Sequence, residues 1–366
     1  MDQTPARRRV PFASIPVNHP EKETEMTMRR FLYVFILVLL GSAWLPLASA
    51  QATTSPTPGT PVIATLDSGT VLAKQGSVNG AWTTEWSGAT APGGLGASVV
   101  SVASDPTNGP LIALADSGGN VWAKEGSLSG AWTEVWNGST APSPAWAVSV
   151  ASDPTHGPLI AVITDDDTVY AKEGSLGAAW TLEYGVGDAA VVSVASDPTN
   201  GPLIAVLTGP GAVYAKEGSL GAAWTLETTG ASAISVASDA TNGALIAVVM
   251  GSTVYAKESG VGAAWLLEFG SSSVYWVAVA SDPTNGPLIA VGLTSGGVYA
   301  KEGSMTAATW VNEWTAGVTP AVASDAVNGA LIAVWDEGSG NIWAKQGLLG
   351  SAWTEETAAG SVAVAG

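Results

Sequence analysis

One strand-rich unit is repeated seven times between residues 61 and 366, and its most regular feature is an Ala-Lys pair. The lysines of these pairs lie 50, 48, 44, 41, 44 and 44 residues apart, at Lys74, Lys124, Lys172, Lys216, Lys257, Lys301 and Lys345. A period of this length suits a propeller blade of four strands better than a helical solenoid unit. The repeat therefore predicts similar modules that carry multiplied equivalent sites.

Each unit is predicted to contain four short antiparallel strands. The copy between residues 191 and 228 reads VVSVASD, PTNG, PLIAVLT, GPGA, VYAKEGSL, GA and AWTLET. Apolar runs rich in Val, Ile, Thr, Tyr and Trp alternate with Gly, Pro and Asn, which are turn residues. No stretch of the unit free of Gly and Pro is long enough for three turns of amphipathic helix. The sequence thus predicts an all-β fold.

The two ends of the array predict how the ring closes. The chain enters mid-unit at Pro61, because PVIATLDSG matches the second strand PLIAV of the other copies. It stops with SVAVAG at residues 361–366, which matches the first strand SVASD. The C-terminal strand would therefore complete the N-terminal blade, leaving no exposed sheet edge at the closure. We expect a seven-bladed β-propeller over residues 61–366.

The residues before the array resemble an export signal. Arg29 and Arg30 precede the uncharged run FLYVFILVLLGSAWLPLASA, which ends in small residues at Ala48 to Ala50. This order predicts a signal peptide over residues 26–50, cleaved after Ala50, and hence a secreted protein without stable membrane insertion. A signal anchor is the alternative, since the run is just long enough to span a bilayer. Residues 1–25 form a polar extension, with a start at Met26 or Met28 as an alternative, and residues 51–60 read as a linker.

The charge of the exported chain restricts its partners. After residue 50 there are seven basic residues, all of them repeat lysines, and twenty-seven Asp and Glu, so seven minus twenty-seven gives a net charge of −20. Such a chain is a poor partner for nucleic acid and anionic membranes, and neutral sugars or cationic ligands remain open. Cysteine is absent, which excludes disulfides and thiol chemistry. The sequence leaves homo-oligomerisation open and predicts no cofactor.

Catalytic and metal-binding patterns are weak. The exported chain has one histidine, His156, which occupies the Asn position of a DPTNG turn, and it lacks a GxSxG motif. The run Asp165 to Asp167 is expected to be a solvated hairpin turn, with a cation site as the less favoured alternative. The repeated SDPTNG segments read as Asx-type turns, because the spacing of an EF-hand is missing. We therefore expect neither an enzyme nor a metal site.

The VYAKEG strand allows two roles for its lysine. Alternation along a strand places the aromatic residue and the lysine on one face and Val, Ala and Glu on the other. Seven unpaired buried ammonium groups would cost more than the stability of a whole domain, so each must be paired or reach water. In a structural arrangement each lysine pairs with a carboxylate from another strand. The candidates are the Asp of the repeated turn and the Glu of the AWTLE strand, at Glu85, Glu183, Glu227, Glu268, Glu313 and Glu356. In a functional arrangement the ammonium lies at the mouth of a cleft between blades.

Two aromatic series are candidate sugar contacts, because a sugar stacks its C–H face on an aromatic ring beside a few polar groups. The first precedes the Ala-Lys pair, at Trp122, Tyr170, Tyr214, Tyr255, Tyr299 and Trp343. The second is expected to begin the fourth strand, at Trp82, Trp132, Trp180, Trp224, Trp265, Trp310 and Trp353. Packing between blades is the favoured role for the second series. The candidate ligand-binding set comprises the first series together with Lys124, Lys172, Lys216, Lys257, Lys301, Trp132, Trp180, Trp224 and Trp265.

Seven units of the form GxVYAKEGSLxxAWTxE resemble the tectonin and tachylectin-type propeller repeats, and they are similar to seven-bladed bacterial propeller lectins. The resemblance covers about 300 residues through a loose motif. It implies multivalent glycan binding in clefts between blades, with the aromatic before Ala-Lys and the Trp of AWT as contact positions. The first and last copies depart from the motif at Leu72, Gln75 and Gln346, which puts sites at the closure in doubt.

These observations predict a secreted, non-catalytic, multivalent carbohydrate-binding propeller whose ligands are neutral rather than anionic glycans. A secreted adhesion or protein-interaction scaffold is the alternative, in which lysines and tryptophans only hold the blades together. A glycoside hydrolase or lyase ranks third, since it would need two converging carboxylates.

Overall fold

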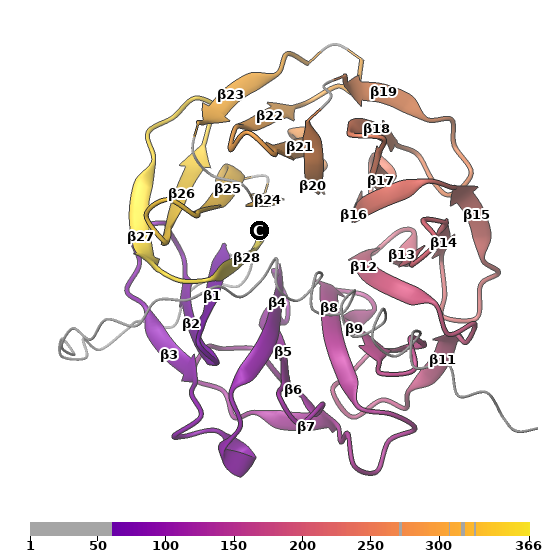
Figure 1. The fold of residues 1–366 in the computed structure, drawn as a ribbon, viewed down its shortest axis with the longest axis vertical. Coiled ribbons are helices and arrows are strands. Elements are labelled where there is room, and N and C mark those ends of the chain that lie inside the picture. Colours follow the sequence, from indigo (N-terminus) through magenta and orange to yellow (C-terminus); the bar gives the residue numbers. More distant parts are fainter. Residues whose placement is uncertain (1–60, 271–272, 307, 316–318, 326) are drawn as a thin grey trace, which may run out of the picture. The chain divides into compact units, whose positions relative to one another are not determined.

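The computed structural model describes residues 61–270, 273–306, 308–315, 319–325 and 327–366. The predicted extension, signal peptide and linker over residues 1–60 lie outside the described residues. The described residues form seven four-stranded antiparallel sheets arranged as the blades of a ring, shown in Figure 1. The all-β, seven-bladed propeller is thus confirmed. Among the described residues no helix has the length and apolar character needed to cross a bilayer.

The first three blades are numbered here from the N-terminus of the ring. Blade I contains β28 (Ser361–Ala365), β1 (Val62–Asp67), β2 (Thr70–Gln75) and β3 (Thr83–Trp86). A short 3-10 helix, η1 (Pro92–Gly94), connects blade I to blade II. Blade II contains β4 (Ala97–Asp105), β5 (Gly109–Asp116), β6 (Val121–Glu125) and β7 (Thr133–Trp136). Blade III contains β8 (Ala145–Asp153), β9 (Gly157–Thr164), β10 (Val169–Glu173) and β11 (Thr181–Tyr184).

The other four blades repeat this plan. Blade IV contains β12 (Ala189–Asp197), β13 (Gly201–Thr208), β14 (Val213–Glu217) and β15 (Thr225–Thr228). Blade V contains β16 (Ala231–Asp239), β17 (Gly243–Met250), β18 (Thr253–Lys257) and β19 (Leu266–Phe269). Blade VI contains β20 (Val274–Asp282), β21 (Gly286–Leu293), β22 (Val298–Glu302) and β23 (Val311–Trp314). Blade VII contains β24 (Thr319–Asp325), β25 (Gly329–Asp336), β26 (Asn341–Gly347) and β27 (Thr354–Ala358).

The first strand of each blade lies at the inside of the ring and the fourth at the outside (Figure 1). The second strands, such as β13, are buried along almost their whole length because both of their faces meet a neighbouring blade. Each core cluster combines side chains from two adjacent blades, so the hydrophobic core lies between the blades. Burial of these apolar faces is the main force that holds the ring together.

The C-terminal strand closes the ring as the sequence predicts. β28 pairs antiparallel with β1, with Ala64 opposite Ala363 and Leu66 opposite Ser361. It also contacts β24 and β25 of blade VII and β4 of blade II. The first and last described segments of the chain therefore share one sheet, and β1 has a partner on both sides.

One end of each of blades II to VII carries the repeated Asp turn, whereas in blade I the first and second strands, β28 and β1, are the two ends of the described chain. Because neighbouring strands are antiparallel, the turn from the first to the second strand and the loop from the third to the fourth lie at the same end, called here the Asp-turn face. In blade IV the Asp197 carboxylate accepts the backbone N–H groups of Thr199 and Asn200. Gly201 follows with φ of 77°, and a Cβ there would lie 2.9 Å from the Gly218 carbonyl oxygen. Glycine is required at this position by both conformation and space.

Candidate functional site

The repeat lysines bind the blades to one another. Six of the seven pair with a glutamate on the outer strand of the preceding blade, and each of the seven is at most 3% exposed. The pairs are Lys74–Glu356, Lys124–Glu85, Lys216–Glu183, Lys257–Glu227, Lys301–Glu268 and Lys345–Glu313. The structural arrangement that the sequence left open as one of two is therefore the one observed. The ammonium groups do not lie at an open cleft mouth.

Lys172 in blade III is the exception to this pairing. The position of the partner glutamate is occupied by Val135, and the Lys172 ammonium donates to the Leu176 carbonyl and lies 4.9 Å from the ring centroid of Trp180. Burial without a carboxylate lowers the pKa of Lys172 to about 8. The ring thus contains six buried Lys–Glu ion pairs, and the ammonium of the seventh lysine contacts a backbone carbonyl and an aromatic ring instead.

The Trp of each AWT segment also holds two blades together. In blades II to VII the indole N–H donates to a backbone carbonyl on the outer strand of the preceding blade. The residue that accepts is the partner glutamate of the lysine, or Val135 where that glutamate is missing. Six such bonds join the pairs Trp132–Glu85, Trp180–Val135, Trp224–Glu183, Trp265–Glu227, Trp310–Glu268 and Trp353–Glu313. The ammonium of the neighbouring lysine lies 4.9–5.6 Å from each ring centroid of the series. These tryptophans precede the fourth strand by one residue rather than begin it, and their main contacts are structural.

A third aromatic series, which the sequence analysis did not separate, lies between the other two. It directly follows the position of the partner glutamate and packs against both aromatic residues of the next blade. The ring centroids are 4.8–5.8 Å apart in the contacts of Trp86, Trp136, Tyr184, Phe269 and Trp314 with their two neighbours. Thr228 and Thr357 occupy this position in the remaining two blades. The sequence could have predicted this series, because five of the seven copies carry an aromatic residue at this position.

The aromatic residues that precede Ala-Lys are half-buried rather than enclosed. Each packs on the preceding blade and faces, across its own sheet, a residue of the outer strand. In blades III, IV and V this neighbour is an exposed leucine, 53–62% accessible, in the register pairs Tyr170–Leu182, Tyr214–Leu226 and Tyr255–Leu267. In the other blades the neighbour is polar, as in Trp122–Glu134 and Tyr299–Asn312. These three pairs, each a half-buried tyrosine beside an exposed leucine, are called here the Tyr–Leu platforms.

The Asp turns are joined from blade to blade as well. Asp153 accepts the backbone N–H groups of Thr155 and His156, and its other oxygen accepts the Ser196 hydroxyl of blade IV. The same Ser-to-Asp bond recurs from Ser152 to Asp105, Ser238 to Asp197, Ser281 to Asp239 and Ser324 to Asp282. The Asx-turn interpretation is confirmed. The His156 ring lies 3.1 Å from Asp153, in the place of the usual Asn, and is part of the turn.

The Asp165–Asp167 run forms the turn between β9 and β10, as predicted. The Asp166 carboxylate accepts the hydroxyl groups of Thr164 and Thr168, and these bonds hold the pKa of Asp166 below its ordinary value although burial acts the other way. In the described part of the chain no cluster of three or more His, Asp or Glu side chains has a geometry suited to a metal ion.

In five of the seven blades a glutamate follows the repeat lysine, and its environment disfavours the charged form. Burial raises the pKa of Glu125, and the nearby Asp105 raises it further. The same direction holds for the equivalent residues Glu173, Glu217, Glu258 and Glu302. Blades I and VII carry Gln75 and Gln346 at this position, so the fold accepts an uncharged amide there.

Replacing Glu125 with Gln is expected to stabilise the protein at pH 7 by roughly 0.5–1 kcal/mol. Because the folded-state pKa is raised above 4.5, the stability contributed by the carboxyl is complete below about pH 4.5 and is lost as pH rises through the folded-state pKa. The advantage of the Gln variant should therefore disappear near pH 4. Urea unfolding at pH 7 and at pH 4 measures this difference in stability. The reverse substitution, Gln75→Glu, should destabilise the protein at pH 7. An equal effect of Glu125→Gln at both pH values would contradict a raised pKa for Glu125.

No protein-family model and no curated protein matches this sequence. Solved structures match it in fold. The BP39L lectin from Burkholderia pseudomallei superposes with a TM-score of 0.59 at 13% identity, over 84% of this chain and 97% of that one. BBS1N, solved in complex with ARL6DN, superposes with a TM-score of 0.52 at 12% identity, over 82% of this chain and 94% of that one. Puromycin hydrolase superposes with a TM-score of 0.50 at 11% identity, over 88% of this chain and 55% of that one. At these identities the likeness establishes the propeller fold alone.

Proposed function

We propose that the protein is a non-catalytic, multivalent carbohydrate-binding propeller that holds neutral sugars on aromatic surfaces between neighbouring blades. The observation that carries the proposal is the set of Tyr–Leu platforms in blades III, IV and V, where a half-buried ring and an exposed leucine lie side by side. Such a surface takes the C–H face of a sugar ring, and the tyrosine hydroxyl supplies a donor and an acceptor at its edge. The fold shared with the BP39L lectin agrees with this function.

The charge distribution favours neutral over anionic sugars. Residues 61–366 contain no arginine, and all seven lysines are buried between the blades. The exposed charges of the described residues are therefore acidic, which repels sulfated or phosphorylated glycans. A sugar at a platform would meet the aromatic and leucine side chains rather than the ammonium groups that the sequence also nominated. Export through residues 26–50 is part of the proposal, and the N-terminal sequence of the secreted protein tests it.

Repetition compensates for weak single sites. Shallow platforms bind individual sugars weakly, and several of them on one rigid ring can engage a glycan-coated surface together, with a gain of roughly a hundredfold or more. The proposal thus predicts weak binding of free monosaccharides and strong retention on a dense glycan surface.

A glycan-array screen of residues 51–366 tests the proposal, followed by calorimetric titration of each hit with a monovalent sugar. Tyr214→Ala is expected to remove one binding site, or to weaken it roughly tenfold. Tyr214→Phe, which keeps the ring, should retain most of the affinity. A silent array with folded protein would contradict carbohydrate binding and favour the protein-interaction scaffold. Unchanged stoichiometry and affinity for Tyr214→Ala would remove the platforms from the function.

A further inference from the structure

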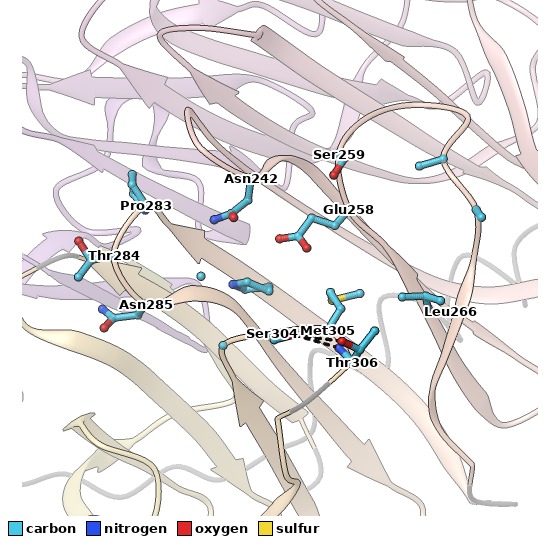
Figure 2. Close-up of a pocket in the computed structure, with 15 residues that line it drawn as sticks. Asn242, Glu258, Ser259, Leu266, Pro283, Thr284, Asn285, Ser304, Met305 and Thr306 are labelled. Atoms are coloured by element: carbon cyan, nitrogen blue, oxygen red, sulfur yellow. Dashed lines mark hydrogen bonds between the residues drawn. The ribbon is translucent and has the colours of Figure 1, made fainter.

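A pocket of about 650 Å³ opens between blades V and VI at the Asp-turn face. The Asp turns of the two blades contribute Asn242 and Asn285, and the loops between third and fourth strands contribute Glu258 and Met305. Leu266 at the start of β19 completes the apolar part of the lining. Figure 2 shows Glu258 between Asn242 and Met305, with its carboxylate directed toward Asn242. The volume is sufficient for a small saccharide.

Both loops that border this pocket depart from the repeat. Blade V reads KESGVGAAW where blades III and IV read KEGSLGAAW, and Ser259 occupies the position that is glycine in the other six blades and adopts φ of 76°. Blade VI reads KEGSMTAATW, one residue longer than the usual loop. A non-glycine residue with positive φ is uncommon, and such strain clusters at functional sites. The two loops thus differ from those of the other blades, whereas Glu258, Asn242 and Asn285 occupy positions of the repeat.

Three side chains of the pocket present acceptor oxygens beside the hydroxyl groups that also line it. Asn242 donates its backbone N–H and its side-chain amide to Asp239, which leaves the amide oxygen as its acceptor. Asn285 donates in the same way to Asp282. Glu258 adds a carboxylate whose Oε1 is buried and makes no hydrogen bond to any described residue. A ligand that supplies donors would complement these three groups. The unbonded Oε1 recurs at Glu125, Glu173 and Glu302, so the pocket beside Glu258 is what sets this blade apart.

Among the described residues, the negative charge of the Glu258 carboxylate is not paired with a cation of its own. Lys301 is the nearby cation, and it is already bound to Glu268 and to the Met305 carbonyl. Burial raises the pKa of Glu258, Asp239 and Glu268 raise it further, and Lys301 acts in the opposite direction. An ammonium group from a ligand would form a charge-assisted hydrogen bond with the Glu258 carboxylate and offset the repulsion between these acids.

We propose that the pocket between blades V and VI binds a saccharide that carries a free, protonated amine. The ammonium pairs with Glu258, the sugar hydroxyls donate to the amide oxygens of Asn242 and Asn285, and the apolar face of the ring packs on Met305 and Leu266. This proposal rests on the proposed function for its ligand class, but its site is separate from the Tyr–Leu platforms and prefers a cationic rather than a neutral sugar.

Calorimetric titration near neutral pH with a β-1,4-linked glucosamine trisaccharide and with its fully N-acetylated form tests this site. We expect the free amine to bind at least tenfold tighter than the acetylated form, since acetylation removes the charge. Glu258→Gln should reduce the affinity for the amine to the acetylated level. Glu302→Gln is the matched control, because it makes the same change at the equivalent position of the next blade, and it should leave both affinities unchanged. Gln75 and Gln346 indicate that both variants will fold.

The outcomes separate this inference from the proposed function. Equal binding of the two trisaccharides, an unchanged affinity of Glu258→Gln, or an equal loss in Glu302→Gln overturns the amine site. Spermidine binding as tightly as the trisaccharide overturns the saccharide part of the proposal. Neutral glycan binding that depends on Tyr214, together with no preference for the amine, retains the proposed function and rejects this site. Amine binding that depends on Glu258, together with a silent response to neutral glycans, supports this site and rejects the platforms.

Discussion

Deleting Ser361–Gly366 is expected to open the ring and to cost on the order of 5 kcal/mol, a large part of the stability of a typical domain. The deletion removes β28 and so exposes one edge of β1, whose residues Val62 to Leu66 are buried. It also uncovers faces of β4, β24 and β25 that contact β28. Urea unfolding and size-exclusion chromatography measure the effect, and we expect a lowered or broadened transition together with self-association through the free edge.

A tail of the same length in Gly and Ser is the control for this deletion. It retains the backbone that can pair with β1 and removes the apolar side chains of Val362 and Val364, so an intermediate loss of stability is expected. A truncated protein that remains monomeric and unfolds at the same urea concentration as the full chain would show that closure by β28 contributes little to the ring.

Replacing Lys216 with Met is expected to destabilise the protein by about 3–5 kcal/mol at pH 7, because the buried Glu183 carboxylate loses its ion-pair partner. Burial already raises the pKa of Glu183, with Lys216 opposing it, so the variant should raise that pKa further. Protonation removes the uncompensated charge, and the loss should therefore shrink as pH falls toward 4. Denaturant unfolding between pH 4 and 7 gives the size and the pH dependence of the effect.

Lys172→Met is the matched control for this substitution. It makes the same change at the equivalent position of the neighbouring blade, where the partner position holds Val135. No carboxylate is left unpaired, so the free energy of unfolding should change by no more than about 1 kcal/mol. Equal losses in the two variants would show that the lysines stabilise the blades by packing and carbonyl contacts rather than through the ion pairs.

The repeat made the architecture predictable. Seven Ala-Lys pairs at a nearly constant period, together with the split unit at Pro61 and Ser361, were sufficient to predict the number of blades and the closure by the last strand. The rule that buried charges are paired gave one of two arrangements for the lysines, and of its two kinds of candidate partner, the turn Asp and the Glu of the outer strand, the Glu is the one observed. The six nominated glutamates include each residue that pairs, and blade II, which supplied no candidate, is the blade that holds Val135.

The candidate binding surfaces were harder to predict from the sequence. Alternation along a strand gave the correct face for Tyr214 and Lys216, but in a propeller both faces meet another blade, so the pattern does not say which side chains reach solvent. The exposure of Leu226 beside Tyr214 depends on its place on an outer strand. The pocket beside Glu258 depends on how two atypical loops from successive blades meet, and no single copy of the repeat contains that information.

The crystal structure of the protein with the strongest neutral glycan from the array tests the central proposal most directly, because it shows where the sugar binds. We predict a sugar ring stacked on the platforms of blades III, IV and V, in contact with Tyr170, Tyr214 or Tyr255 and with the neighbouring leucine. Ligand bound elsewhere on the ring, with these three platforms empty at saturating concentration, would contradict the proposed binding mode.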